Sequence, residues 1–337
     1  MRTGIFLVMT TTAFGALAET QQECRVIKKD TARLACYDQL FGVPEAVIKE
    51  SAAKQSTAYG TAEAGSAAQE VSDIEVRLKS EDQLADNRFV ILPHRQTYIL
   101  PYTYLDDPNG EPYRGNTVLA EESVDNEEIK FQISLKVPIA RDFLVNQSTL
   151  WMGYTQVSLW QAYNGEASAP FRETNYEPEI YWSFPTGLNA FGIAMEEASI
   201  GFVHQSNGRG EPLSRSWNRI FANFVFAKDQ WGFAVKPWYR IKEDEKDDDN
   251  PDIESYLGYA DFIATYKWDD EYVLSALVRN NFRSSDNHTS TTLSLSFPLP
   301  GRLNGYIEYV DGYGETLIDY DHRNQRIGIG FILNDWF

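Results

Sequence analysis

The sequence predicts an all-β protein, a 12-stranded antiparallel transmembrane β-barrel, on the basis of three observations. From about residue 96 onward, apolar and polar residues alternate with a period of two, which marks strands with one apolar and one polar face. Short turns and long polar loops follow one another between these segments, as they do in outer-membrane barrels. Tyr and Trp gather near the segment ends, as in an aromatic girdle, and the chain finishes on Phe337, a terminal aromatic typical of such barrels.

The alternation is regular in the segment KFQISLKVPIA (130–140), where Phe131, Ile133 and Leu135 share one face. The segments TTLSLSFPLP (291–300) and RIGIGFILNDWF (326–337) repeat the pattern. Several segments are longer than the usual strand of a soluble protein. We expect strands near residues 96–105, 128–139, 148–162, 173–184, 190–206, 215–228, 231–243, 253–268, 271–283, 290–299, 302–314 and 325–337.

A barrel in a membrane inverts the polarity of a soluble protein, so its apolar faces point to lipid and its polar faces point inward. A soluble β-sandwich would also alternate and is the alternative fold. Twelve strands enclose a narrower lumen than the roughly 16–18 strands of porins. We therefore expect polar side chains to fill much of the lumen, among them Lys130, Gln132, Lys136, Lys236 and Arg240.

The beginning of the chain carries the features of an exported protein. Residues 1–18 are interpreted as a signal peptide, with Arg2, an apolar middle and a small-residue cleavage site, and a retained membrane anchor is the alternative. No later run of 18 apolar residues offers a transmembrane helix. The 49 acidic against 30 basic residues argue against nucleic-acid binding and fit a cell-surface protein with acidic loops.

A short helical extension is expected between the signal peptide and the barrel. An oxidising compartment favours a disulfide between its two cysteines, and two free thiols are the alternative. In one continuous helix Cys24 and Cys36 would lie about 18 Å apart, so a bridge requires a turn between them. The expected organisation is a signal peptide (1–18), a small helical segment with a Cys24–Cys36 disulfide (19–48), a linker and lead-in (49–89), and the barrel domain (90–337).

The stretch HQSNGRGEPLSRSWNR (204–219) contains the candidate site. By period two, His204 and Ser206 share the apolar, lipid-facing side of their strand, and Asn218 shares that of the next strand. Polar side chains are costly on that face unless they serve a purpose, and chemistry on lipid is the purpose suggested. His204 would act as general base toward the Ser206 hydroxyl, with Asn218 orienting the ring. On spacing alone this is a weak signal, because His–Ser pairs in strands are usually incidental.

Several longer motifs carry a resemblance to a known family. The stretch 204–219, with SAPFRETNYEPE (168–179), VKPWY (235–239), DDNPDI (248–253), GYGETLIDY (312–320) and the final ILNDWF, closely resembles the outer-membrane phospholipase A family over roughly residues 90–337. The resemblance implies a calcium-dependent phospholipase A in the bacterial outer membrane that is active as a homodimer. It implies cleavage of both sn-1 and sn-2 acyl esters of glycerophospholipids, and of lysophospholipids.

The resemblance also implies roles for individual residues. The family's Ser-His-Asn triad falls on His204, Ser206 and Asn218. The Gly208 N–H is implied as an oxyanion-hole donor, helped by calcium-bound water.

The family's calcium site falls on the Arg209 carbonyl and the Ser214 hydroxyl, with a serine from a partner subunit at the position of Ser168. Two serine hydroxyls, a carbonyl and waters suit calcium, which prefers oxygen ligands. A second, less secure calcium site is implied near Glu211 and Asp249, although EDEKDDDNPD (243–252) is by default a solvated acidic loop.

Gln156 matches an interfacial glutamine of the family and shares a face with Met152 and Tyr154, and a lumen-facing polar residue is the alternative. The remaining histidines lie in polar or loop surroundings without a partner motif, and none is expected to be catalytic: His94, His288 and His322. A small-solute channel or a structural barrel with an inert site is the rival function. Liposome swelling without fatty-acid release would favour that rival.

Overall fold

The computed structural model describes residues 72–87, 89–114, 124–142, 145–269, 271–301 and 303–336. The expected signal peptide, the Cys24–Cys36 pairing, the linker up to residue 71 and Phe337 lie outside the described residues. Residues 69–337 form one compact unit by their contacts. All elements described below belong to this unit.

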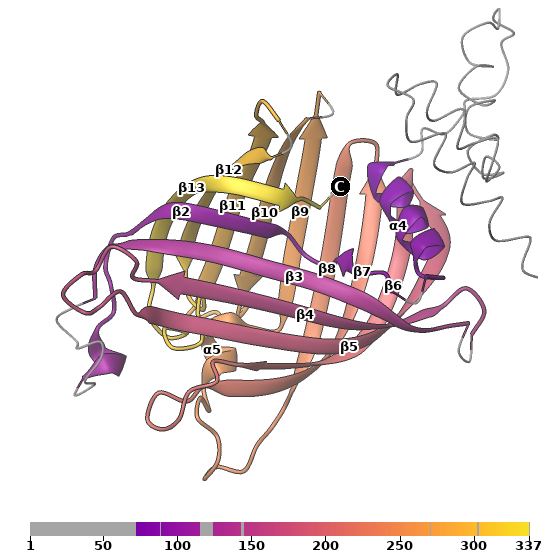
Figure 1. Ribbon diagram of the computed structural model, residues 1–337. Helices are drawn as coiled ribbons and strands as arrows, with labels where there is room; N and C mark the ends of the chain where they lie inside the picture. The colour runs from indigo at the N-terminus through magenta and orange to yellow at the C-terminus, as the bar shows by residue number, and fades with distance from the viewer. Residues whose placement is uncertain are drawn as a thin grey trace, which may run out of the picture. The chain divides into compact units, whose positions relative to one another are not determined.

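Twelve long strands of the described residues close into an antiparallel barrel, which confirms the predicted fold class (Figure 1). Each strand pairs with its neighbours along the chain, and the first long strand pairs with the last. The strands are β2 (Thr97–Leu105), β3 (Glu127–Arg141), β4 (Thr149–Trp160), β5 (Phe171–Ala190), β6 (Ile193–Ser206), β7 (Ser216–Lys228), β8 (Trp231–Ile241), β9 (Ala260–Trp268), β10 (Tyr272–Asn280), β11 (Thr289–Pro298), β12 (Asn304–Gly312) and β13 (Asn324–Asn334). A two-residue strand, β1 (Leu92–Pro93), pairs with β3, and a short 3-10 helix, η1 (Glu111–Tyr113), follows β2.

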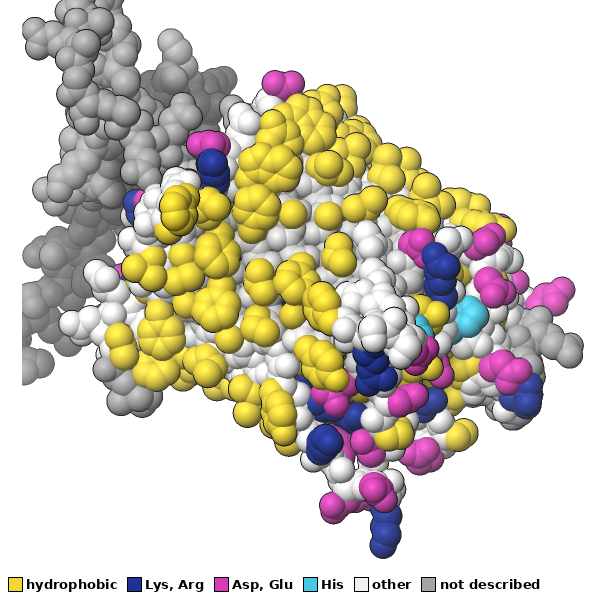
Figure 2. All heavy atoms as spheres, turned by 180° about the vertical axis from the view of Figure 1, so that it is seen from behind, with side chains coloured by type: hydrophobic (Ala, Val, Ile, Leu, Met, Phe, Trp, Pro, Cys, Tyr) yellow, Lys and Arg dark blue, Asp and Glu magenta, His cyan; other side chains and the backbone are white. Residues whose placement is uncertain are grey.

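As predicted, apolar residues of the strands point outward and polar residues point into the barrel. On β3, Ile133 and Ile139 are exposed on the outer surface, whereas Lys130 and Lys136 are buried inside. Figure 2 shows the result on one side of the barrel, where hydrophobic side chains cover a broad band and charged side chains gather at one end. No helix in the described part of the chain is long and apolar enough to cross a membrane.

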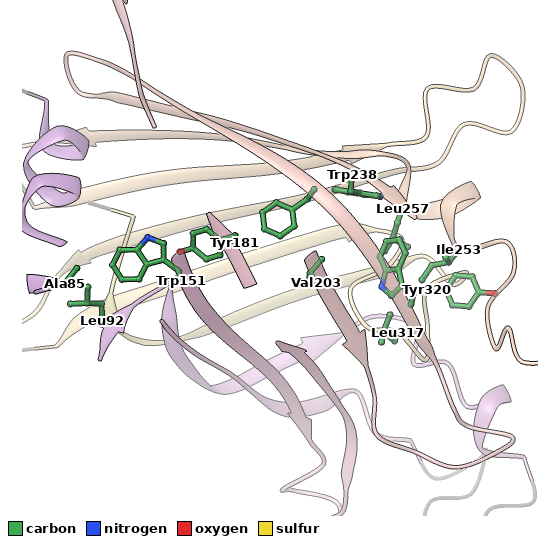
Figure 3. Packing of buried hydrophobic residues seen from close by; sticks show 12 residues of the cluster. Ala85, Leu92, Trp151, Tyr181, Val203, Trp238, Ile253, Leu257, Leu317 and Tyr320 are labelled. Carbon is green, nitrogen blue, oxygen red and sulfur yellow. The ribbon is translucent and has the colours of Figure 1, made fainter. Parts of the chain in front are cut away.

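One expected strand is shorter than predicted. Residues 253–268 were expected to be extended throughout, but their beginning forms the helix α5 (Ile253–Leu257) and only β9 is a strand. Ile253 and Leu257 are one helical turn apart, and both are buried in the hydrophobic cluster that includes Trp238 and Tyr320 (Figure 3). Burial of these two side chains inside the mouth of the barrel favours the helix over a continued strand.

A second helix, α4 (Asp73–Leu84), lies in the segment expected as linker and lead-in, at the end of the barrel that carries the short turns (Figure 1). It begins where the Ser72 side chain accepts a hydrogen bond from the Glu75 N–H, a typical N-cap. Glu81 of this helix forms a buried ion pair of 2.7 Å with Lys136 of β3. Because Glu81 is bound to a lumen residue, the helix belongs with the barrel.

Ion pairs connect the strands inside the barrel, beside a lumen cavity of about 320 Å³. Arg172 of β5 contacts Glu128 of β3 at 2.7 Å and Asp319 of the loop after β12 at 2.5 Å, and all three side chains are fully buried. Arg326 of β13 contacts the other oxygen of Glu128 at 2.8 Å. The predicted polar lumen is therefore a network of paired charges.

Removing one member of this network should destabilise the barrel strongly. Arg172→Met is expected to lower the free energy of unfolding by about 3–5 kcal/mol, because the buried Glu128 and Asp319 lose a cation. Denaturant unfolding in micelles, followed by the heat-modifiable gel shift, measures the change. Arg323→Met is the matched control, since Arg323 is 59% exposed in its pair with Asp311, where solvent screens the interaction, and the substitution should leave the free energy of unfolding nearly unchanged. Equal losses for the two variants would show that burial does not set the cost.

Candidate active site

The candidate triad lies on the outer surface of β6 and β7, near the rim that carries the long loops. In the register of the two strands, His204 pairs directly with Asn218, and Phe202 pairs with Ile220 two positions farther from the rim. Phe202 and Ile220 are 39% and 46% exposed, so their face is the outer one. Because residues two apart on a strand share a face, His204, Ser206 and Asn218 all lie on the lipid-facing side.

His204 and Asn218 are joined by a hydrogen bond of 2.9 Å between the imidazole Nδ1 and the amide Oδ1. An amide oxygen only accepts, so Nδ1 carries the proton and Nε2 of the neutral ring keeps its lone pair. Ser206 is the next outward residue along β6, and its Oγ has no hydrogen-bond partner among the described residues. A base and an unengaged hydroxyl therefore occupy adjacent positions of one strand face.

The inner faces of β6 and β7 hold these two strands in register. Gln205 Oε1 accepts hydrogen bonds from Trp217 Nε1 and from the Arg219 guanidinium, both at 2.9 Å. The Arg219 guanidinium lies 3.9 Å from the centre of the Trp217 ring, and Trp217 packs edge-on against Trp238 of β8. The outward side chains are thus positioned by a packed sheet, which is more precise than a loop.

The loop between β6 and β7 is an ordered turn that begins beside the candidate nucleophile. Gly208 has a φ of +65°, and a Cβ at this position would lie 3.0 Å from the Tyr176 ring, so glycine fits best. Asn207 Oδ1 accepts hydrogen bonds from the Arg209 and Arg215 N–H groups at 3.2 and 3.0 Å. These bonds hold the predicted oxyanion donor two residues beyond Ser206.

Oxygen atoms suited to calcium meet in this loop and in the loop after β8. Ser214 Oγ donates a hydrogen bond of 2.5 Å to Asp249 Oδ2. The neighbouring Asp249 carboxylate raises the pKa of Glu211 above its ordinary value. The Arg209 carbonyl accepts no hydrogen bond in the described part of the chain. These atoms are all oxygen donors, the type of ligand that calcium prefers.

The two residues expected at a subunit contact are both accessible on this chain. Ser168 is exposed in the loop between β4 and β5. Gln156 pairs in register with the exposed Ile133, so it lies on the outer face and not in the lumen. Its side chain accepts a hydrogen bond from the Tyr154 hydroxyl at 3.0 Å and donates one to Ser158 Oγ at 3.1 Å. A strip of bonded polar side chains therefore lies on the outward side of β4; Tyr154 and Gln156 are partly exposed, and Ser158 is buried.

One residue at the site was not predicted from the sequence. Glu243, two residues beyond the end of β8, accepts a hydrogen bond of 2.9 Å from Asn218 Nδ2. The three other histidines have partners elsewhere. His94 contacts Glu179 in the lumen at 2.5 Å, His288 bonds to a backbone carbonyl of helix α5, and His322 bonds to a backbone carbonyl of the loop after β2.

A closed barrel with an apolar outer belt defines an outer-membrane β-barrel protein, and the Ser–His–Asn arrangement on its lipid face is of the kind found in ester hydrolases. The family model for phospholipase A1 matches residues 74–333. The phospholipase A1 of Escherichia coli K12 is 39% identical over 252 residues, which cover 75% of this chain and 84% of that protein. The chain belongs to the phospholipase A1 family, and it is a phospholipase of the bacterial outer membrane.

Solved structures show the same fold. The outer membrane phospholipase A of E. coli, determined as an active-site mutant, superposes with a TM-score of 0.73 at 36% identity, covering 79% of this chain and all of that one. The Salmonella typhi outer membrane phospholipase, a dimer with bound calcium, gives a TM-score of 0.69 at 37% identity, covering 74% of this chain and 94% of that one. A relative from Neisseria meningitidis is 35% identical over 357 residues and covers 95% of this chain and 92% of its own, so it also aligns with much of the region before the barrel.

Proposed function

We propose that this chain hydrolyses acyl esters of glycerophospholipids with Ser206 as the nucleophile, in a reaction that depends on calcium and on dimerisation. The observation that carries the proposal is the 2.9 Å hydrogen bond between His204 Nδ1 and Asn218 Oδ1, one outward position from Ser206. A serine and a histidine oriented by a third group form the arrangement of serine hydrolases. Phospholipid reaches this face laterally from the membrane, without entering the lumen.

The proposed reaction has two steps. Ser206 Oγ attacks the ester carbonyl carbon while His204 Nε2 takes the hydroxyl proton, and the tetrahedral intermediate collapses as His204 protonates the departing lyso-phospholipid. Water then attacks the acyl-enzyme with the same proton transfers and releases the fatty acid. Asn218 orients the ring throughout. We propose that sn-1, sn-2 and lysophospholipid esters are all substrates, because the nucleophile lies on an open outer surface.

The oxyanion that forms in each step needs hydrogen-bond donors placed in advance. Gly208 supplies its N–H from the turn that follows the nucleophile. The Arg209 carbonyl and Ser214 Oγ would hold calcium together with the partner subunit's Ser168, and Glu211 and Asp249 would form a second, weaker site. When bound, the ion supplies positive charge that stabilises the oxyanion. The calcium in the S. typhi structure supports this proposal.

We propose that two copies meet through the outward polar strip at Gln156. Bonded polar groups on a lipid-facing surface gain from being covered, because lipid offers them no hydrogen bonds. The dimer formed by the S. typhi relative supports this proposal.

The direct test is an assay of the purified, refolded protein on a defined phospholipid in detergent, with and without calcium. Fatty-acid release that requires calcium is the expected result. A refolded barrel that swells liposomes and releases no fatty acid would instead support the rival function, a small-solute channel with an inert site.

Asn218→Ala is expected to lower kcat by about 10- to 100-fold, a milder loss than removal of the nucleophile. The Ser206–His204 pair survives in this variant, and only the orientation of the ring is lost. Steady-state kinetics on one phospholipid measure the change. A loss as large as that of Ser206→Ala would contradict an orienting role.

A further inference from the structure

We infer that Glu243 is a positioning residue of this site, a carboxylate that sets which way the Asn218 amide faces. The inference rests on the proposed triad. Asn218 Nδ2 donates to Glu243 Oε1 at 2.9 Å, while Asn218 Oδ1 lies 2.9 Å from His204 Nδ1. One amide thus bridges the proposed general base and a carboxylate.

The hydrogen-bonding chemistry of these groups allows only one orientation of the Asn218 amide. An ionised carboxylate has only acceptors, so it can bind the NH₂ end of an amide and not the oxygen end. With Nδ2 held by Glu243, Oδ1 faces His204 and requires the proton on Nδ1, which leaves Nε2 free to act as a base toward Ser206. If the amide turned over, Nδ2 would face Nδ1, the ring proton would move to Nε2, and the base would be lost.

The sheet explains why this carboxylate reaches the site. Asn218 of β7 pairs on one side with His204 of β6 and on the other side with Ile241, the last residue of β8. Tyr239 and Ile241 are both exposed on the outer face, and Glu243 occupies the next outward position along the chain. His204 on β6, Asn218 on β7 and Glu243 just beyond the end of β8 therefore follow one another along the same rim.

The carboxylate also supplies a charge that a neutral triad member lacks. When His204 accepts the Ser206 proton it becomes a cation, and an amide alone stabilises that cation little. Glu243 places a negative charge one amide away, where it polarises the Asn218 side chain in the favourable sense. Because Glu243 is half-exposed, solvent screens part of this interaction and the expected effect is moderate.

Three substitutions at position 243 test the inference against wild type, in the full-length refolded protein with saturating calcium. We expect kcat to fall about two-fold for Glu243→Gln, which can still accept from Nδ2, and about ten-fold for Glu243→Ala. Glu243→Lys should fall further than Glu243→Ala, because a lysine only donates and would draw Oδ1 away from His204. KM should stay within about two-fold of wild type throughout, since Glu243 acts on the base and not on substrate binding. Glu245→Lys is the control: Glu245 is exposed in the same loop and the substitution makes the same change of charge.

A double-mutant cycle with Asn218→Ala separates positioning from a general role of the loop. If Glu243 acts through Asn218, Glu243→Ala should cause no further loss of kcat in the Asn218→Ala background. An equal loss in both backgrounds, an equal loss for Glu245→Lys and Glu243→Lys, or wild-type kcat for Glu243→Ala would each overturn the inference. The proposed function fails separately: it falls if Ser206→Ala retains activity, whereas an inactive Ser206→Ala with fully active Glu243 variants sinks this inference alone.

Discussion

Ser206→Ala is expected to abolish phospholipid hydrolysis, with a loss of kcat of about 10⁵- to 10⁶-fold, while the barrel remains folded. In the proposed reaction the hydroxyl forms the acyl-enzyme, and no other part of the proposed machinery would replace that bond. The substitution removes one oxygen that makes no hydrogen bond among the described residues, so the sheet loses no contact. Fatty-acid release measures the loss, and the heat-modifiable gel shift shows that folding is retained.

The best control for this variant lies directly across the hairpin. Ser216 pairs with Ser206 in the register of β6 and β7, so it presents a second hydroxyl on the same outward face at the same rim. Ser216→Ala should keep activity within a few-fold of wild type. If the outcomes of the two variants were exchanged, Ser216 would be the nucleophile, and the pairing of His204 with Ser206 would be wrong.

The strands of this fold were predictable because the two sides of the barrel wall face different environments. Lipid on one side and a polar lumen on the other impose a period of two on every strand, and that period is legible in the sequence. The helices were not predictable on this basis. At α5, Ile253 and Leu257 fit the spacing of a helical turn as well as they fit the apolar side of a strand, and only their burial inside the barrel decides between the two. Helix α4 is connected to the barrel by an ion pair between Glu81 and Lys136, a contact between residues far apart in the sequence.

The candidate site shows the same division. The outward positions of His204, Ser206 and Asn218 follow from the alternation, and their roles were implied by the resemblance to the family. Glu243 could not be identified, because it opens a run of acidic residues whose ordinary interpretation is a solvated loop. What distinguishes Glu243 from its acidic neighbours is the register of β7 and β8, which puts it beside Asn218. The period of two, continued past Ile241, places Glu243 on the outward face. This placement singles out Glu243 only when the strand pairing is known.

Chelation of calcium is expected to remove activity, and the requirement for calcium should be tied to the presence of a second subunit. In the proposed site, a single subunit would offer the ion only the Arg209 carbonyl and Ser214 Oγ, which are too few ligands for an ion that prefers about six to eight oxygens. A site completed by the partner subunit's Ser168 would therefore bind calcium only in the dimer. Such an arrangement would keep a lipase on the lipid face of its own membrane inactive until two copies meet.

Ser168→Ala tests this coupling, because one hydroxyl would serve both the ion and the subunit contact. We expect the calcium concentration for half-maximal activity to rise by at least about ten-fold, equivalent to roughly 1.4 kcal/mol, with a parallel fall in cross-linked dimer measured on the same samples. The double variant Ser168→Ala/Ala169→Ser is the control, because it keeps one hydroxyl in the loop but moves it by one residue, and it should behave like Ser168→Ala. Full activity from a demonstrably monomeric preparation, or in the presence of excess chelator, would rule out the shared calcium site and leave the triad untouched. If activity follows the dimer content but not the calcium concentration, the proposed subunit contact stands. The proposed role of calcium in stabilising the oxyanion would then be wrong.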